Sequence, residues 1–268
     1  MKIISIFVGK LVIIAGNILK RGSVLPGYIA LKLNKKLLSQ FELPNKIIAV
    51  TGSNGKGSTS NMIASIFKNQ GYKVTYNNKD SNLIEGITTA LLNDSDLKGK
   101  IKTDVLVMEV DERYAKYIFK SIKPNVLVIT NICRDQPPRQ GDYDLVSNEI
   151  LKAIQNDITL VLNGDDPILR RFKTKNIIYY GIEKNKYSYI KNKFNNLNIN
   201  YCPICNNKLE YNYYTFENNG DYYCPKCDFK RPELKLKVTN LNYEKNEMTI
   251  NNKYKISIPY NILFGVYN

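Results

Sequence analysis

The clearest sign of chemistry in this sequence is a run of glycine, lysine and hydroxyl residues, Thr51-Gly52-Ser53-Asn54-Gly55-Lys56-Gly57-Ser58. It follows an apolar stretch at 47–51 and precedes a helical pattern near 57–70, the context of a phosphate-binding loop. Backbone N–H groups and the helix N-terminus would bind an anion there, and Lys56 would reach the terminal phosphates. Because Gly57 follows the lysine, a hydroxyl for Mg²⁺ would come from Ser58 or Thr59. The run predicts nucleotide binding; a glycine turn that only caps a helix is the weaker alternative.

Acidic side chains end the apolar stretch at 105–110, where Glu109 and Asp111 stand. Ligands of parallel sheets bind at the carboxyl ends of the strands. Mg²⁺ is commonly held by one or two carboxylates together with phosphates and water. We therefore predict that Glu109 and Ser58 bind Mg²⁺ and that Lys56 and Glu109 serve catalysis. Solvated acids at a strand end are the alternative, which we favour for Glu112.

Four of the five cysteines form two CPxC pairs, Cys202-Pro-Ile-Cys205 and Cys224-Pro-Lys-Cys227, with 18 residues between them. This spacing is typical of a zinc ribbon, in which two tight turns supply four thiolates. A closed shell of four thiolates would stabilise the fold without binding substrate. Two disulfides would require an oxidising compartment, which the nucleotide site argues against. We expect Cys133, the fifth, to be a small buried side chain.

Apolar runs and helical patterns alternate along the part of the chain that must position these residues. This alternation predicts a P-loop α/β fold, a parallel sheet with helices on both faces. We expect strands at 47–51, 73–76, 105–110, 126–130, 159–162 and 177–180, and helices near 57–70, 82–93, 112–121, 144–155 and 166–172. Antiparallel strands are expected at 234–238, 248–250 and 254–258. We predict a helical segment at 1–45 (helices at 3–19 and 27–40) and a central domain at 46–268, with the zinc ribbon inserted at about 198–231.

Composition sets limits on function. The 268 residues include 39 basic and 24 acidic side chains, a net charge of +15, and no histidine. Imidazole-based triads are therefore excluded, while phosphates, acidic lipid and nucleic acid would be attracted. Residues 1–45 hold seven basic side chains and one acidic one. Their apolar run, interrupted by Lys10, is shorter than the roughly 20 residues of a spanning helix. We expect a cytoplasmic protein whose first helix lies on the protein or at the inner membrane surface; a solvated helix is the alternative to contact with an anionic lipid or its pyrophosphate.

Four segments in this order, TGSNGKGSTSNMIA, VMEVDE, TNICRDQPPRQGDYD and LNGDDP, resemble the Mur ligase superfamily. The segments KRGSVLPGYIALKLNKKLL and YNNKDSNLIEGITTAL and the four-cysteine insertion resemble one subfamily in particular, the MurT subunits of lipid II isoglutaminyl synthase. The resemblance runs from about residue 19 to residue 268 and implies the central ATP-binding domain of a Mur ligase. It also implies that the C-terminal ligase domain of these enzymes is missing from this sequence.

The resemblance implies an ATP-dependent carbon–nitrogen ligase of peptidoglycan biosynthesis, with Mg²⁺ and Zn²⁺ as its metals. Such a subunit activates the D-glutamate carboxylate of lipid II as an acyl phosphate, and a partner class I glutamine amidotransferase (GatD-like) supplies ammonia from glutamine. Residues Gly52, Ser53, Asn54, Gly55, Lys56, Gly57, Ser58 and Thr59 would then bind the nucleotide together with Asn131, Asp135 and Asn268. In LNGDDP, we expect Asp166 to cap a helix before Pro167.

Three alternatives stay open at this point. The first is a folylpolyglutamate synthase, which shares the GKGS loop but lacks the cysteine insertion and the NICRDQ segment. The second is an archaeal cell-wall peptide ligase. The third is a zinc-ribbon nucleic-acid-binding protein, suggested by the basic charge and by the tyrosines around the cysteines. Because alternating tyrosines are more typical of packing on a small sheet, we do not expect nucleic acid.

Overall fold

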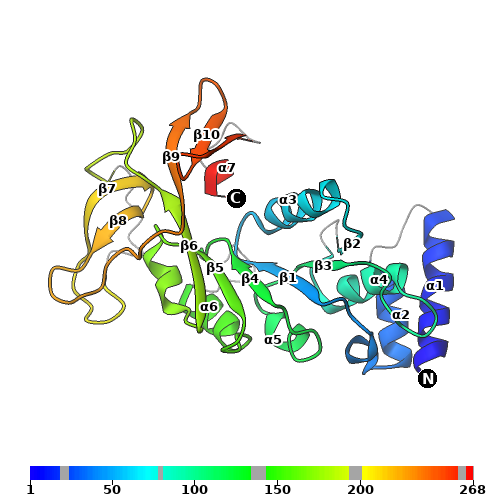
Figure 1. Ribbon diagram of the computed structural model, residues 1–268. Helices are drawn as coiled ribbons and strands as arrows, with labels where there is room; N and C mark the ends of the chain where they lie inside the picture. The colour runs from blue at the N-terminus through cyan, green and yellow to red at the C-terminus, as the bar shows by residue number, and fades with distance from the viewer. Residues whose placement is uncertain (19–23, 78–80, 134–142, 193–200, 259–263, 268) are drawn as a thin grey trace. The chain divides into compact units, whose positions relative to one another are not determined.

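The computed structural model describes residues 1–18, 24–77, 81–133, 143–192, 201–258 and 264–267 (Figure 1). The chain divides into two compact units: Met1–Val128 with Cys133–Ile158, and Ile129–Ile132 with Thr159–Asn268. Both are built around mostly parallel strands, so the predicted mixed α/β class is confirmed. The predicted domain boundaries at residues 45, 198 and 231 stay a prediction.

The first unit contains a sheet with the strand order β4-β1-β3-β2, in which β1 and β2 both run parallel to β3. Its strands are β1 (Lys46–Thr51), β2 (Val74–Tyr76), β3 (Val105–Glu109) and β4 (Val126–Ile129). All five residues of β3 are buried, as expected for a strand covered on both faces. Figure 1 shows α3 (Lys56–Asn69) on one side of this sheet and α5 (Ala115–Ile118) on the other. The carboxyl ends of β1 and β3 therefore lie side by side, with Val50 paired to Glu109.

The remaining helices of this unit follow the predicted order, and all except α1 are shorter than predicted. They are α1 (Lys2–Ile18), α2 (Leu25–Leu33), the 3₁₀-helix η1 (Leu37–Gln40), α4 (Ile84–Asp94) and α6 (Tyr143–Leu151). The helix predicted at 27–40 is interrupted because the side chain of Asn34 accepts a hydrogen bond from Lys36 N, which competes with helical pairing. The helix predicted at 112–121 is reduced to α5 because the Asp111 carboxylate accepts from Arg113 N and forms a turn first.

Helices α1, α2 and α4 pack closely, and glycines permit the approach. A Cβ atom at Gly27 would lie 1.9 Å from the carbonyl oxygen of Glu85, and one at Gly9 would lie 2.6 Å from a methyl group of Leu92. Gly27 N also donates to Thr89 Oγ1 at 2.9 Å. Within the described residues, no helix combines the length and the apolar character needed to cross a membrane.

The second unit contains strands in the order β11-β10-β9-β6-β5, with β5, β6 and β9 parallel and β9, β10 and β11 antiparallel. The antiparallel strands predicted near the end of the chain are thus confirmed. Its elements are β5 (Thr159–Asn163), η2 (Pro167–Arg171), β6 (Asn176–Ile182), β7 (Glu210–Phe216), β8 (Asn219–Tyr223), β9 (Leu236–Asn242), β10 (Glu247–Ile250), β11 (Tyr254–Ser257) and α7 (Phe264–Tyr267). The helix predicted at 166–172 is the 3₁₀-helix η2. Strands β7 and β8 form a separate hairpin.

Candidate nucleotide site and cysteine cluster

The loop between β1 and α3 takes a shape that requires glycine at two positions. Gly52 has φ 128° and Gly55 has φ 78°, values that residues with a Cβ atom rarely adopt. Gly55 is also the N-cap of α3, whose first turn closes with a 2.9 Å hydrogen bond from Thr59 N to Gly55 O. The loop therefore directs the N-terminus of a 14-residue helix at the space above the strand ends, a geometry suited to an anion.

The ammonium group of Lys56 lies over this loop. Its Nζ donates to Gly52 O at 2.5 Å and to Ser53 O at 3.4 Å, and it pairs with Glu112 Oε1 at 3.3 Å. Burial raises the pKa of Glu112, while the charge of Lys56 opposes the shift. The expectation that Glu112 is a solvated acid is therefore wrong, because its side chain is 7% exposed and paired with the loop lysine.

Glu109 ends β3 and lies against the start of α3. A Cβ atom at Gly57 would come within 3.3 Å of Glu109 Oε2, so the residue after the lysine leaves room for this carboxylate. Asn82 Nδ2 donates to Glu109 Oε1 at 3.3 Å. Asn77 holds the backbone of the same residue in both directions, donating to Glu109 O and accepting from Glu109 N at 2.8 Å each. The prediction that this carboxylate faces the loop is consistent with the structure.

Two asparagines of this site, Asn77 and Asn82, were not singled out by sequence reasoning. They stand 32 and 27 residues before Glu109, and no local spacing connects them with it. Their position between β2 and α4, in the segment YNNKDSN, is the only signal the sequence offers. They orient the carboxylate that we predict as a metal ligand.

Oxygen atoms suited to Mg²⁺ lie at the start of α3. The Oγ1 atom of Thr59 is buried and has no hydrogen-bond partner among the described residues, while Ser58 is half-buried. Ser60, by contrast, uses its hydroxyl to bond Lys56 O at 2.7 Å. A carboxylate against Gly57 and an unused hydroxyl two residues later form a donor set of the kind that Mg²⁺ takes, so the residues present fit this ion.

Cys133 is exposed and lies against the loop, contrary to the expectation that it is buried. Its backbone N donates to Ser53 Oγ at 2.9 Å, and Asn54 Nδ2 lies 3.6 Å from its Sγ. The polar loop leaves this thiol at the surface. Asn131 belongs to the second unit, and Asp135 and Asn268 lie outside the described residues, so the roles of all three stay predictions.

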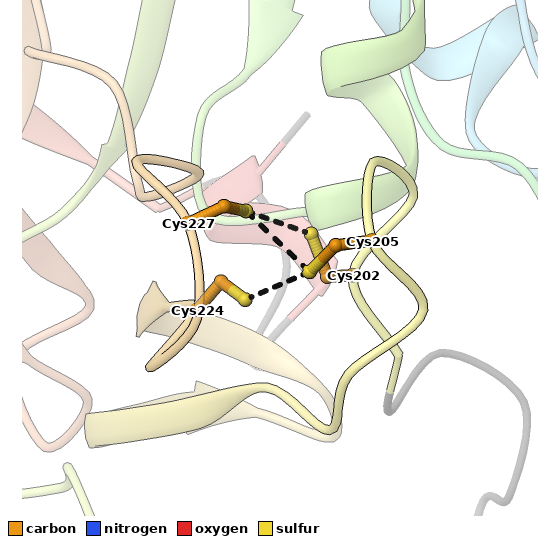
Figure 2. A group of neighbouring side chains, drawn as sticks. All are labelled: Cys202, Cys205, Cys224 and Cys227. Carbon is orange, nitrogen blue, oxygen red and sulfur yellow. Dashed lines mark hydrogen bonds between the residues drawn. The ribbon is translucent and has the colours of Figure 1, made fainter.

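The four remaining cysteines come together in the second unit, as their spacing predicts (Figure 2). Their sulfur atoms all lie within 4.8 Å of one another, and all four thiols are free of disulfides. Cys205 Sγ lies 3.4 Å from Cys224 Sγ and 3.6 Å from Cys227 Sγ. A tetrahedral Zn²⁺ with about 2.3 Å bonds separates its sulfurs by about 3.8 Å. The cluster therefore has the size of a metal shell.

Backbone and amide groups surround the sulfur atoms. Ile204 N lies 3.4 Å from Cys202 Sγ and Lys226 N lies 3.5 Å from Cys224 Sγ. Hydrogen bonds from Asn207 lower the pKa of Cys205 to about 6, which favours the thiolate form that binds metals, whereas burial and the neighbouring cysteines raise the pKa of Cys227. Four free thiols are the ligand set of a structural Zn²⁺, so the residues of this cluster fit that ion in chemistry as well as in size.

Tyrosines near the cluster pack against one another. The rings of Tyr211 and Tyr214 stack at 4.2 Å between centroids, and Tyr222 is fully buried against Phe229. Stacked and buried rings offer little face to a nucleic-acid base, which supports the packing interpretation.

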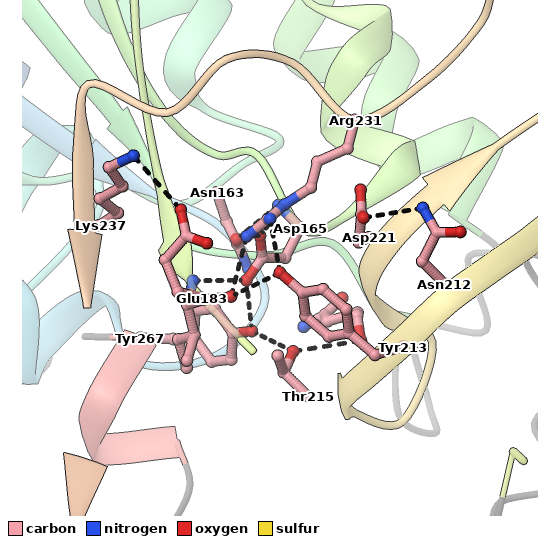
Figure 3. Close-up of polar contacts among 12 residues, drawn as sticks. Asn163, Asp165, Glu183, Asn212, Tyr213, Thr215, Asp221, Arg231, Lys237 and Tyr267 are labelled. Atoms are coloured by element: carbon pink, nitrogen blue, oxygen red, sulfur yellow. Dashed lines mark hydrogen bonds and ion pairs between the residues drawn. The ribbon is translucent and has the colours of Figure 1, made fainter. Parts of the chain in front are cut away.

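A buried ion pair joins distant parts of the second unit (Figure 3). Asp165 is fully buried and accepts from Arg231 Nε at 2.8 Å, from Ile182 N at 2.8 Å and from Tyr267 OH at 2.7 Å. Burial raises the pKa of Asp165 to about 6, against the charge of Arg231. Next to it, Asp166 accepts from Ile168 N at 2.8 Å, so the predicted cap is confirmed.

Comparison with known proteins decides the family. The family model of the Mur ligase middle domain matches residues 50–213, which include the phosphate loop, Glu109 and LNGDDP. The chain belongs to the Mur ligase family. The predicted resemblance is thereby confirmed.

Relatives within the family point to one group. The chain is 36% identical over 174 residues to the MurT subunit of lipid II isoglutaminyl synthase (glutamine-hydrolyzing) from Staphylococcus aureus, which covers 63% of this chain and 39% of that protein. The MurT subunit from Streptococcus pneumoniae is 37% identical over 171 residues, 63% of this chain and 38% of that protein. The chain thus spans about two fifths of the length of these Mur ligase relatives.

A solved structure of a peptide ligase has a similar fold. The pseudomurein peptide ligase type C from Methanothermus fervidus superposes with a TM-score of 0.69 and covers 87% of this chain and 46% of that one, at 24% identity. This likeness extends the agreement in fold beyond the residues that the family model matches.

Proposed function

We propose that this chain is the ATP-binding part of a MurT-type ligase subunit that activates the D-glutamate carboxylate of lipid II for amidation. The observation that carries the proposal is the meeting of Lys56, the N-terminus of α3 and the Glu109 carboxylate at one end of the sheet. The 36% identity to a MurT subunit supports the choice of substrate.

The reaction uses two displacements. An oxygen of the substrate carboxylate attacks the γ-phosphorus of ATP, the bond to the bridging oxygen breaks, and ADP leaves. Ammonia then attacks the acyl carbon of the acyl phosphate, inorganic phosphate leaves and the amide remains. Lys56 and the amide groups of the loop would stabilise the charge on the transferred phosphoryl group. Glu109 with Ser58 or Thr59 would hold Mg²⁺, which neutralises phosphate charge.

Ammonia would come from a partner class I glutaminase of the GatD type. The chain contains no histidine, which fits a subunit that leaves glutamine hydrolysis to another protein. The cysteine cluster would hold one structural Zn²⁺, remote in sequence from the phosphate loop. ATP use and four reduced thiols support a cytoplasmic location.

The test supplies lipid II labelled with ¹⁸O in the D-glutamate carboxylate, together with glutamine, a class I glutaminase and Mg–ATP. We expect ADP, amidated lipid II and transfer of one ¹⁸O atom to inorganic phosphate, read by mass spectrometry. A parallel reaction replaces this chain with a protein of the same family that has the full length of the MurT relatives. Amide formation without label in phosphate, or no ADP from either protein, would reject the proposed reaction.

A further inference from the structure

Helix α1 presents an apolar stripe to solvent, made of Ile3, Phe7, Leu11, Ile14 and Ile18. These residues recur every three or four positions, so they share one face of the helix, and they are between 48% and 78% exposed. The opposite face, with Ser5, Ile6 and Gly9, is the buried one. Surface helices normally turn charged and polar residues outward. None of the described residues covers this stripe.

Of the two lysines of α1, Lys2 stands at its first position, and Lys10, in its interior, is turned away from the stripe. Lys10 Nζ donates to Leu92 O at 2.5 Å, at the C-terminal end of α4, where the helix dipole favours a positive charge. Burial lowers the pKa of Lys10. Helix α2, which is packed beside α1 in Figure 1, also exposes apolar side chains, namely Leu25, Tyr28 and Leu33.

Charge identifies what this surface binds. The first 41 residues contain seven lysine or arginine side chains and no acidic one. Lys32, Lys35 and Lys36 are exposed. Two copies of the same surface would bring like charges together, whereas an anionic lipid surface would neutralise them. With one face buried and the opposite one apolar and exposed, α1 suits the plane of a membrane interface, with its stripe among the upper acyl chains and lysines near the headgroups.

We propose that α1 and α2 dock the protein onto an anionic membrane surface through the apolar stripe and the neighbouring lysines. Docking would hold the unit that contains the phosphate loop at the membrane surface. The inference does not depend on the proposed ligase reaction, because it rests on the N-terminal helices alone.

The test measures sedimentation of the 268-residue chain with phosphatidylcholine vesicles that contain either no anionic lipid or about one third phosphatidylglycerol. The stripe variant combines Phe7→Gln, Leu11→Gln and Ile14→Gln. Its matched control combines Ile66→Gln, Leu97→Gln and Ile190→Gln, which also replaces three exposed apolar side chains. A charge variant combines Lys32→Gln, Lys35→Gln and Lys36→Gln. Circular dichroism and thermal melting check that each variant folds, and neither ATP nor lipid II is present.

We expect the anionic vesicles to bind at least about tenfold more tightly than neutral ones, with binding weakened by salt. The stripe variant should lose at least about tenfold in affinity for anionic vesicles. The charge variant should lose roughly fivefold for each replaced lysine that lies near the membrane surface. The control should bind as the original protein does. Equal binding to both vesicle types, or unchanged binding of a folded stripe variant, would overturn the proposal. So would self-association by light scattering that the stripe variant abolishes while vesicle binding is absent, since a second copy would then cover the stripe.

Discussion

The carboxylate of Glu109 is held in place by its neighbours before any ligand arrives. The side chain of Asn77 bonds both the backbone N–H and the backbone carbonyl of Glu109. Asn82 donates to one oxygen of the carboxylate, and Gly57 leaves room for the other. A preorganised anionic ligand at the start of α3 is suited to Mg²⁺ bound by nucleotide phosphates.

Replacement of Glu109 by Gln should therefore act through the metal. We expect Mg–ATP affinity to fall by at least roughly 10- to 100-fold, since even outer-shell partners of metal ligands have effects of that size. Affinity for ATP in EDTA should stay unchanged, because Gln keeps the size of the side chain. Calorimetric titrations with and without Mg²⁺ give both values, and an equal loss in the two would assign Glu109 a structural role.

Local spacing made the residues of the loop and the cysteine pairs predictable, because each set lies within a few positions of chain. Glu112 shows where this reasoning fails. Its burial and its pairing with Lys56 arise from two segments 56 residues apart, and nothing near Glu112 in the sequence indicates them. The expectation for Cys133 is wrong in the opposite sense. This thiol was predicted to be buried, but it is exposed where it contacts the polar loop.

At the scale of the elements, the two CPxC turns and the hairpin β7–β8 form one small module with a core of few residues. Leu209, Tyr222 and Phe229 pack there with the cysteines. So small a core gains stability from a metal. Structural zinc contributes on the order of 10 to 16 kcal/mol in small fingers at neutral pH.

We expect one zinc ion per chain by elemental mass spectrometry. Cys205→Ser should lower the metal content well below one, and a strong chelator should expose the thiols of the cluster to alkylation. Cys133→Ser is the matched control and should keep the full metal content, because Cys133 is not part of the cluster. Two intact disulfides in protein purified under reducing conditions would contradict the assignment.

The cap of η2 predicts a pH effect on stability. Burial raises the pKa of Asp166 from 3.8 to about 7, with a further contribution from Asp165. The folded protein therefore keeps a proton that the unfolded chain releases, so the free energy of unfolding should fall as pH rises from about 4 to 7. One such group contributes at most about 1.4 kcal/mol per pH unit.

Asp166→Asn keeps a capping side chain but cannot titrate. Urea unfolding at about pH 5 and about pH 8 should show a smaller loss of stability with rising pH in this variant than in the original protein. Asp165 keeps part of the dependence, since burial raises its pKa to about 6. Parallel pH profiles for the two proteins would show that Asp166 is ionised throughout.

The sequence predicted the type of each element correctly where apolar runs were long. The predicted bounds of helices were wrong where side chains compete with the backbone for hydrogen bonds. Strands β1 to β6 were predicted to within two residues at each end, because buried parallel strands are continuous runs of apolar residues. The hairpin β7–β8 was not predicted, and β9 (Leu236–Asn242) begins and ends later than the strand predicted at 234–238. The helices near Asn34 and Asp111 came out shorter because these side chains bond nearby backbone N–H groups. Helix propensity alone does not account for side chains that replace backbone carbonyls as hydrogen-bond acceptors.

At the scale of the whole chain, the ion pair of Asp165 and Arg231 connects the end of β5 with the segment that follows the cysteines, and Tyr267 adds α7. No sequence pattern predicts a contact between residues 66 and 102 positions apart.

Arg231→Met should leave a buried carboxylate without its partner and lower the free energy of unfolding by about 3–5 kcal/mol. Adding Asp165→Asn should recover part of that loss, since the uncompensated charge is then gone. Lys237→Met provides the control. It removes a pair with Glu183 that is 3.5 Å long and largely exposed, for which we expect less than about 1 kcal/mol. A small effect of Arg231→Met by urea unfolding would mean that water reaches Asp165.

The central claim, that this Mur ligase chain binds Mg–ATP through the loop between β1 and α3, is tested most directly by calorimetric titration of three proteins. They are the original chain, Lys56→Ala and Lys68→Ala, which removes an exposed lysine from the other end of the same helix. We predict that the original chain and Lys68→Ala bind one Mg–ATP with the same affinity and that Lys56→Ala gives no measurable binding. Equal affinities for all three proteins, or no binding by any of them, would contradict the account.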